Sequence, residues 1–496
     1  MIEQRPSLTD LLQSLTLAQA QELLQRLVAD QPELIESVDR YVNVLSQPDS
    51  SVTQPSRPKR KTSINTTTFN LRAREILWNA VHEWEDGRDD DDIGYDMNAL
   101  IKDAIAFSEE GDSANAMAVL QAITEGALEN WDVVDNYCGL TPHDCEVDFD
   151  GAWAKVFLST DLTEEEVLEW QETLEGWLEL EGFSMAFEAL RQGWTYPPLV
   201  RVLEGDPSTP RAWAGEPPDW ADDLTKIRLK ILDEQERYEE YLNLAKVEGF
   251  TQEHLTMLGQ LGRVEQAMTT AQTEMTTMAE AQALAETLRE QNQLEQALEI
   301  TRKGLELEQD SHYKAYNFAV WTSDLAEGLA QNKDALDARI SAFKFKPSFQ
   351  DYEKIEQMAE ADWSEIRHAL LQHLRKSKEW GLEEAQVDIF LHEGLVEDAI
   401  AAVSKLSQYQ SRIILRVMDA AIDAHSQWVI DKARPFAESI MDSGKAKAYY
   451  DAVEWLKRVK AAHHELGQDA DWSKYYQSLA QQHGRKYKLM SLLKQL

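Results

Sequence analysis

A short pattern returns in the second half of this 496-residue sequence: a small turn residue is followed by an alanine inside an amphipathic stretch. It occurs in GRVEQAMTTA, NQLEQALEITRKGLEL, NKDALDARISAFKFKP and GLVEDAIAAVSKL. The four alanines, Ala267, Ala297, Ala335 and Ala399, are separated by 30, 38 and 64 residues, and the last interval is twice 32. A period in the thirties is typical of proteins built from repeated pairs of helices.

The small side chain of the alanine lets the two helices of a hairpin approach closely. Each hairpin then packs its other apolar face on the next hairpin. We therefore predict an all-α protein whose residues 221–496 form an α-solenoid of tetratricopeptide-like helix hairpins. Apolar and polar residues do not alternate in any convincing run, so no strand is predicted.

The sequence before residue 221 divides into three parts. Leucines at helical spacing predict a small N-terminal helical segment over 1–45. Residues 46–68 are rich in Pro, Ser and Thr, which indicates a flexible basic linker. Helical patterns resume over 69–220 and predict a helical domain that ends in a junction rich in Trp and Pro.

Composition narrows the class of protein. The chain has 89 acidic and 49 basic residues, a net charge of −40, so most of its surface should repel a phosphate backbone. Its two cysteines exclude a disulfide-stapled scaffold and favour a reducing compartment. No segment approaches the roughly 20 apolar residues of a membrane helix. We expect an acidic, soluble, cytoplasmic protein that does not bind membranes.

The residues do not assemble a recognisable active site. We find no HExxH motif, nucleophile elbow, Walker A loop or dinucleotide-binding glycine pattern. The acidic run after Thr163 fits a helix start, with Thr163 and Glu166 forming a capping box. We therefore expect no enzymatic activity and no cofactor.

Two segments resemble metal sites but lack the required spacing. Cys138, His143 and Cys145 offer at most three neighbouring ligands at no standard zinc spacing. In the acidic run Asp89–Asp92, a calcium-loop alignment would put Ile93 at a position that requires an oxygen ligand. We interpret both segments as solvated loops and expect no metal.

The stretch RQGWTYPPLVRVLEGD, residues 191–206, interrupts the helical pattern. Gly193 can end one helix, Pro197 disfavours helical backbone at Tyr196, and Pro198 can begin the next helix. We interpret the stretch as a structural corner that Trp194 and Tyr196 pin against neighbouring helices. The alternative is a groove in which these two aromatic residues bind a partner.

Two basic segments are candidate contact sites. In the tail, Arg485, Lys486 and Lys488 precede several leucines, so the segment either covers the last helices or binds a partner or nucleic acid. We favour the covering role. In the linker, the cluster around Lys59, Arg60 and Lys61 either makes weak contacts with phosphate or binds the protein's own acidic surface.

Four motifs resemble the helical region of bacterial SWIM zinc finger family proteins. They are LTDLLQSLTLAQAQELLQRL, GDSANAMAVLQAIT, QGWTYPPLVRVLEG and HGRKYKLMSLL, in that order. A SWIM finger requires a Cys-x-Cys pair followed by Cys-x-His, and this chain contains neither. The resemblance therefore implies the helical partner region without the finger, which was lost or is encoded on another chain.

These observations predict a non-catalytic helical-repeat adaptor or scaffold that binds another protein, such as a separately encoded SWIM zinc finger protein. The alternative is an accessory factor in nucleic-acid transactions that contacts DNA or RNA through the basic linker and tail.

Overall fold

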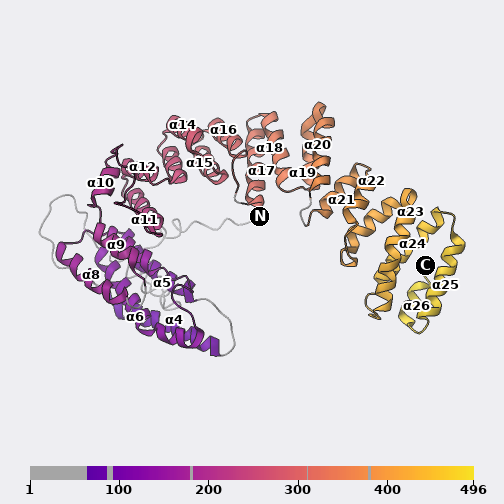
Figure 1. Ribbon diagram of the computed structural model, residues 1–496, viewed down its shortest axis with the longest axis horizontal. Coiled ribbons are helices and arrows are strands. Elements are labelled where there is room, and N and C mark those ends of the chain that lie inside the picture. Colours follow the sequence, from indigo (N-terminus) through magenta and orange to yellow (C-terminus); the bar gives the residue numbers. More distant parts are fainter. Residues whose placement is uncertain (1–63, 86–92, 179–181, 310, 378–380) are drawn as a thin grey trace, which may run out of the picture. The chain divides into compact units, whose positions relative to one another are not determined.

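The structure, a computed structural model, describes residues 64–496 apart from 86–92, 179–181, 310 and 378–380. Every regular element in this part of the chain is a helix, which confirms the all-α prediction (Figure 1). None of these helices combines the length and apolar character that a bilayer span requires. The segment 1–45, the basic residues Lys59, Arg60 and Lys61, and the run Asp89–Asp92 lie outside the described residues.

The helices before the junction enclose an apolar core centred on the completely buried indole of Trp153, whose ring lies 4.7 Å from that of Trp170. The first of them begins at Thr66, inside the range expected as linker. The expected capping box is present, since the Thr163 N–H donates to Glu166 at 2.8 Å. These helices are α4 (Thr66–Glu85), α5 (Ile93–Glu109), α6 (Ser113–Cys138), α7 (Phe149–Leu158), α8 (Glu164–Leu178) and α9 (Ser184–Gln192). Helix α10 (Pro197–Leu203) lies inside the junction and packs in a separate apolar cluster with residues of α11 and α12.

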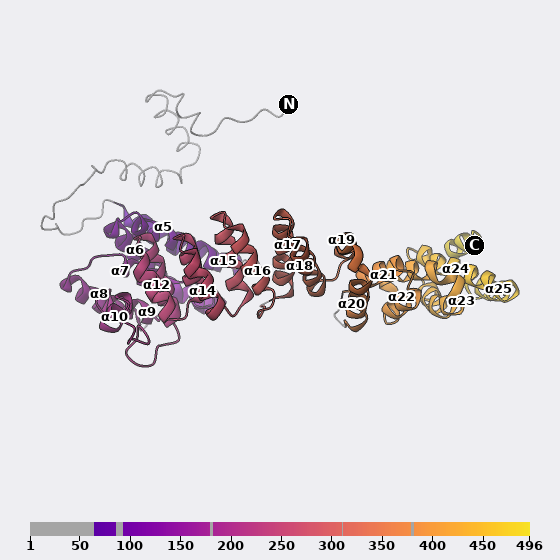
Figure 2. The same cartoon turned by 90° about the horizontal axis from the view of Figure 1, so that it is seen from above.

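The next twelve α-helices pack mainly against their neighbours in the sequence, and both ribbon views show α15 beside α16 and α17 beside α18 (Figures 1 and 2). They are α11 (Ala221–Glu234), α12 (Tyr238–Val247), α13 (Thr251–Gln260), α14 (Val264–Glu274), α15 (Met278–Glu290), α16 (Leu294–Gly304), α17 (His312–Gly328), α18 (Asn332–Phe345), α19 (Phe349–Ala359), α20 (Trp363–Lys376), α21 (Glu383–His392) and α22 (Val396–Val403). Short 3₁₀ turns lie at Glu360–Asp362 and Gln408–Gln410.

The four alanines of the sequence pattern occupy equivalent positions. Each is fully buried and is the fourth residue of its helix, in α14, α16, α18 and α22 respectively. Two residues before each helix begins, the backbone has positive φ, at Gly262, Asn292, Ala330 and Gly394. The following N–H then donates to the carbonyl five residues earlier, as in a Schellman turn. The pattern therefore marks four helix starts that share one turn geometry and one buried alanine position.

Helix α11 connects the two groups. It packs against α7 and α9 before the junction and against α12 after it. Lys155 of α7 is buried and pairs with Glu234 of α11 at 3.3 Å and with Glu109 of α5. The helices before the junction and those after it are therefore connected by continuous packing through α11.

The last helices pack around Trp455, which is fully buried. Helix α23 is kinked at His425, where φ is −130° and ψ is 37°, and contains Pro435. These helices are α23 (Ser411–Asp442), α24 (Tyr449–Glu465), α25 (Asp469–His483) and α26 (Tyr487–Leu493).

Candidate functional site

The junction has the local geometry expected from its sequence. Gly193 follows α9 with a φ of 52°, and its N–H donates to Ala189 O. Tyr196 is extended, with φ −63° and ψ 120°, and the two prolines, Pro197 and Pro198, open α10. These observations confirm that the stretch ends one helix and begins another.

Both aromatic residues of the junction use their polar atoms inside the chain. Trp194 is half-buried, and its Nε1–H donates to Leu158 O at 2.7 Å, while the guanidinium of Arg237 lies 4.8 Å from the ring centroid. The Tyr196 hydroxyl accepts the N–H of Ala214 at 2.9 Å. These contacts support the interpretation of a structural corner.

A buried cation beside the junction was not anticipated from the sequence. Arg228 of α11 is fully buried, and its Nη2 donates to Gln192 Oε1 at 2.6 Å. Its Nε and Nη1 have no hydrogen-bond partner in the described part of the chain. Burial lowers the pKa of Arg228 to about 10, although Glu188 and Glu248 favour the charged form. An arginine in an amphipathic helix reads as a surface residue, so only the packing reveals this one.

A pocket of about 440 Å³ lies against the junction. Its lining includes the apolar residues Leu162, Val167 and Leu190 and two arginines, Arg191 and Arg237. Both arginines are already paired, Arg191 with Glu188 at 2.8 Å and Arg237 with Glu240 at 3.1 Å. Both arginines of this pocket are therefore already neutralised by carboxylates of the chain.

The basic tail packs against the preceding helices. Leu489 and Leu493 are buried, and Lys486 Nζ donates to Met441 O, at the end of α23, at 2.6 Å. A cation at this position complements the C-terminal end of the α23 dipole. Arg485 and Lys488 remain exposed. The structure thus separates Lys486, which is engaged, from its two basic neighbours.

The two cysteines lie at the end of α6 and in the loop that follows it. Cys138 and Cys145 are not joined in a disulfide, and burial raises the pKa of Cys138. Nowhere in the described ranges do three or more His, Cys, Asp or Glu side chains come together as a metal site would require. A Cβ at Gly94 would meet Cys145 O at 1.9 Å, so this loop packs closely on α5.

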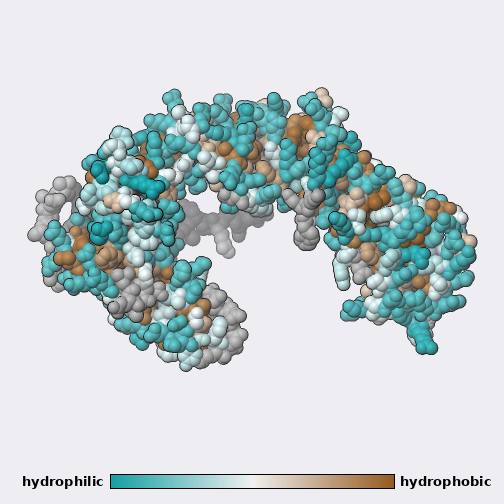
Figure 3. All heavy atoms as spheres, in the orientation of Figure 1, coloured by the Kyte–Doolittle hydropathy of each residue, from teal (hydrophilic) through white to brown (hydrophobic). Residues whose placement is uncertain are grey.

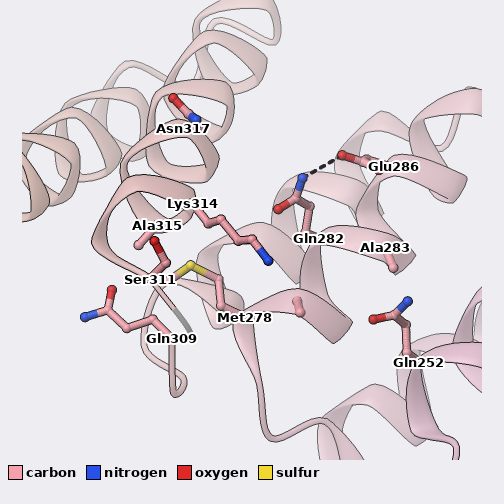
Figure 4. A pocket seen from close by; sticks show the side chains of 11 residues that line it. Gln252, Met278, Gln282, Ala283, Glu286, Gln309, Ser311, Lys314, Ala315 and Asn317 are labelled. Carbon is pink, nitrogen blue, oxygen red and sulfur yellow. Dashed lines mark hydrogen bonds between the residues drawn. The ribbon is translucent and has the colours of Figure 1, made fainter. Parts of the chain in front are cut away.

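The groove that best suits a partner lies between α13, α15 and α17, and it encloses about 350 Å³ (Figure 4). We call it the amide groove because side-chain amides from all three helices line it. Its lining residues are Gln252, Met278, Ala279, Gln282, Ala283, Glu286, Gln309, Ser311, Lys314, Ala315 and Asn317.

Helix α15 forms the floor of the amide groove. Ala279, Gln282, Ala283 and Glu286 are spaced three and four residues apart, so they share one face of the helix. The small alanines leave the hollow, while Gln282 Nε2 donates to Glu286 Oε1 at 2.8 Å along its edge. The neighbouring face of α15 is buried against other helices. This division of faces leaves one face of α15 open to a ligand.

Polar groups around the amide groove are available for bonding. Lys314 extends into the hollow from α17, and Gln252 faces it from α13 (Figure 4). Within the described residues, the Lys314 ammonium makes no ion pair or hydrogen bond, and the buried Oε1 of Gln309 has no donor. An extended peptide offers both N–H and C=O groups at regular intervals, so this mixture of donors and acceptors suits it.

Comparisons with known proteins add no family assignment, because no protein-family model and no curated protein matches this sequence. The resemblance to SWIM zinc finger family proteins therefore stays a prediction. The candidate site rests on geometry alone.

Proposed function

We propose that this chain is a non-catalytic, cytoplasmic adaptor built as an α-solenoid of tetratricopeptide-like hairpins, and that it binds another protein through the amide groove. The partner that the SWIM resemblance implies is a separately encoded SWIM zinc finger protein. The observation that carries the proposal is the set of polar side chains from α13, α15 and α17 that line one groove. Among them, Gln252, Lys314 and Asn317 make no hydrogen bond within the described residues.

The repeated turns support the solenoid. The same left-handed turn and the same buried alanine recur in four helix pairs. The two helices of each pair are therefore joined in the same way, and the first helix takes an equivalent position in each pair. Stacked first helices form a continuous surface in proteins of this kind. Helices α13 and α15 are such first helices, and so is α17.

The chemistry of the groove supports protein binding over catalysis. The groove holds one cation, Lys314, and one carboxylate, Glu286, and its other polar groups are amides and a hydroxyl. Amides instead pair with peptide backbone, as both donors and acceptors.

Affinity capture from cells at moderate salt tests the proposal. We expect one protein to be recovered in stoichiometric amount with the wild-type chain and to be lost with Ala283→Arg, which fills the groove. Ala420→Arg, on the exposed surface of α23, is the matched control and should keep the partner. Recovery of this chain alone, or a partner retained by Ala283→Arg, would overturn the proposal.

The alternative, contact with nucleic acid, involves a different surface. It concerns the basic linker and the C-terminal tail and shares no residue with the amide groove, so either function can stand without the other.

A further inference from the structure

Two turns near the C-terminus lie side by side and carry an unusual concentration of free positive charge. Residues 443–448 connect α23 to α24, and residues 484–486 connect α25 to α26. Lys486 Nζ donates to Met441 O at 2.6 Å, and His483 Nε2 lies 3.7 Å from Asp442 Oδ1. These contacts fix the second turn against the end of α23, next to the first turn.

Four cations project from these two turns and the helix starts that follow them. Lys445, Lys447, Arg485 and Lys488 are all exposed, and none of their charged groups makes an ion pair or hydrogen bond within the described residues. Cations elsewhere in α24 differ, since Arg458 pairs with Asp419 at 2.8 Å. The charge of the four residues is therefore available to a ligand.

Two exposed tyrosines accompany the cations. Tyr450 is 60% exposed in the first turn of α24, and Tyr487 is 86% exposed at the start of α26. The two helices run in the same direction, because Lys486 contacts the end of α23 while Lys460, far along α24, contacts Leu496 O. Both tyrosines therefore lie at the same end of the helix pair.

We call these six residues the terminal patch: Lys445, Lys447, Tyr450, Arg485, Tyr487 and Lys488. Asp442 and Asp451 are the carboxylates next to the patch in the sequence, and Glu438 also lies near His483. Asp442 faces His483, and Gln482 Nε2 contacts it at 3.4 Å, while Glu438 pairs with Arg434 at 3.6 Å. The four unpaired cations thus outnumber these three carboxylates, in a chain whose net charge is −40.

We infer that the terminal patch binds single-stranded nucleic acid, with its cations on the phosphates and its two tyrosine rings stacked on bases. Stacking on aromatic rings tolerates any sequence and adds about 1–3 kcal/mol per base. An acidic protein segment would satisfy the cations but has no flat bases for the rings. At physiological salt the screening length is about 8 Å. Carboxylates that lie farther than this from the patch therefore repel the ligand only weakly.

This inference does not depend on the amide groove. A fluorescent oligonucleotide of about ten residues, oligo-dT in one arm and oligo-U in the other, is titrated with the full chain over a series of salt concentrations. Four phosphate contacts predict a slope of log K against log salt of about −3. The two oligonucleotides differ in the sugar and in the 5-methyl group of the base, and binding in either arm supports the inference.

Four variants locate the binding surface. Replacing all four cations of the patch with Gln should weaken oligonucleotide binding at least tenfold. The control replaces four exposed lysines elsewhere that have no partner within the described residues, and its affinity should stay within about twofold of wild type. These control lysines are Lys102, Lys333, Lys376 and Lys405. Tyr450→Ala with Tyr487→Ala should weaken binding fivefold or more and keep the salt slope. Gln at the linker residues Lys59, Arg60 and Lys61 should retain binding.

Four results would overturn the inference. They are no binding at low salt, equal loss in the control lysine variant, tyrosine variants that bind as tightly as wild type, and patch-dependent self-association in sedimentation. The third would show that the patch recognises negative charge without stacking, and polyglutamate binding with the same affinity would then indicate an acidic protein partner. The fourth would assign the patch to the acidic surface of a second copy of the chain.

Discussion

Single residues set the turn that precedes each buried alanine. Three of the four left-handed positions hold Gly262, Asn292 and Gly394, which accept that conformation readily, but the fourth holds Ala330, with a φ of 56°. Left-handed backbone costs an alanine about 1–2 kcal/mol. This position is therefore a local weakness in an otherwise favourable series of turns.

Ala330→Gly should stabilise the protein. The relief of left-handed strain exceeds the extra unfolded-state entropy of glycine, so we expect the free energy of unfolding to rise by about 0.5–1 kcal/mol. Gly394→Ala, at the equivalent turn, should lower it by a similar amount. Urea unfolding measures both changes, and two changes of the same sign would contradict the equivalence of these turns.

Asp150 should make stability depend on pH. Its carboxylate accepts the N–H groups of Met185 and Ala186 at the start of α9, yet burial raises its pKa from 3.8 to about 6. The folded state therefore holds this proton more tightly than the unfolded chain, and the stability that this group contributes falls as pH rises from 3.8 to about 6.

Asp150→Asn removes that titration. The free energy of unfolding of the variant minus that of the wild type should therefore increase across the same pH range. Thermal or urea unfolding at several pH values measures the difference. A difference that stays constant, or that falls with pH, would show that the folded carboxyl titrates as it does in the unfolded chain.

At the scale of the helix, the pairing of α15 with α16 depends on a close approach. A Cβ at Gly304 would lie 2.4 Å from the Cβ of Ala281 and 3.0 Å from the Phe318 ring. Gly304→Ala should force the helices apart and cost about 1–3 kcal/mol in the free energy of unfolding. Gly176→Ala in α8, where no atom lies within 4 Å, should instead stabilise by about 0.5–1 kcal/mol.

Chemical unfolding of these two glycine variants checks the opposite signs. If Gly304→Ala proved neutral, the close contact of α15 and α16 would not contribute to stability.

The sequence predicted the elements better than the site. Periodicity, the alanine anchors and the residues from Gly193 to Pro198 act locally, so their helices and turns could be anticipated. The amide groove could not, because Gln252, Gln282 and Asn317 are far apart in the chain, and each resembles an ordinary solvated residue. Arg228 was missed for a related reason, since its burial depends on the packing of α11 against α9.

At the scale of the whole molecule, charge and surface chemistry separate two regions of the chain. Hydrophilic residues cover most of the face that Figure 3 shows. The amide groove offers hydrogen-bonding groups with little net charge, whereas the terminal patch offers cations and aromatic rings. An adaptor with these two surfaces could hold a protein segment and a nucleic acid strand at the same time.

Site-specific photo-crosslinking tests the adaptor proposal most directly. A benzophenone side chain replaces Ala283 in the amide groove, or Ala420 on the exposed surface of α23, and cells are irradiated before the chain is purified. We predict one discrete protein adduct from position 283 and none from position 420. An adduct from position 420 alone, or none from either position while oligonucleotide binding persists, would contradict the assignment of this groove as the partner site.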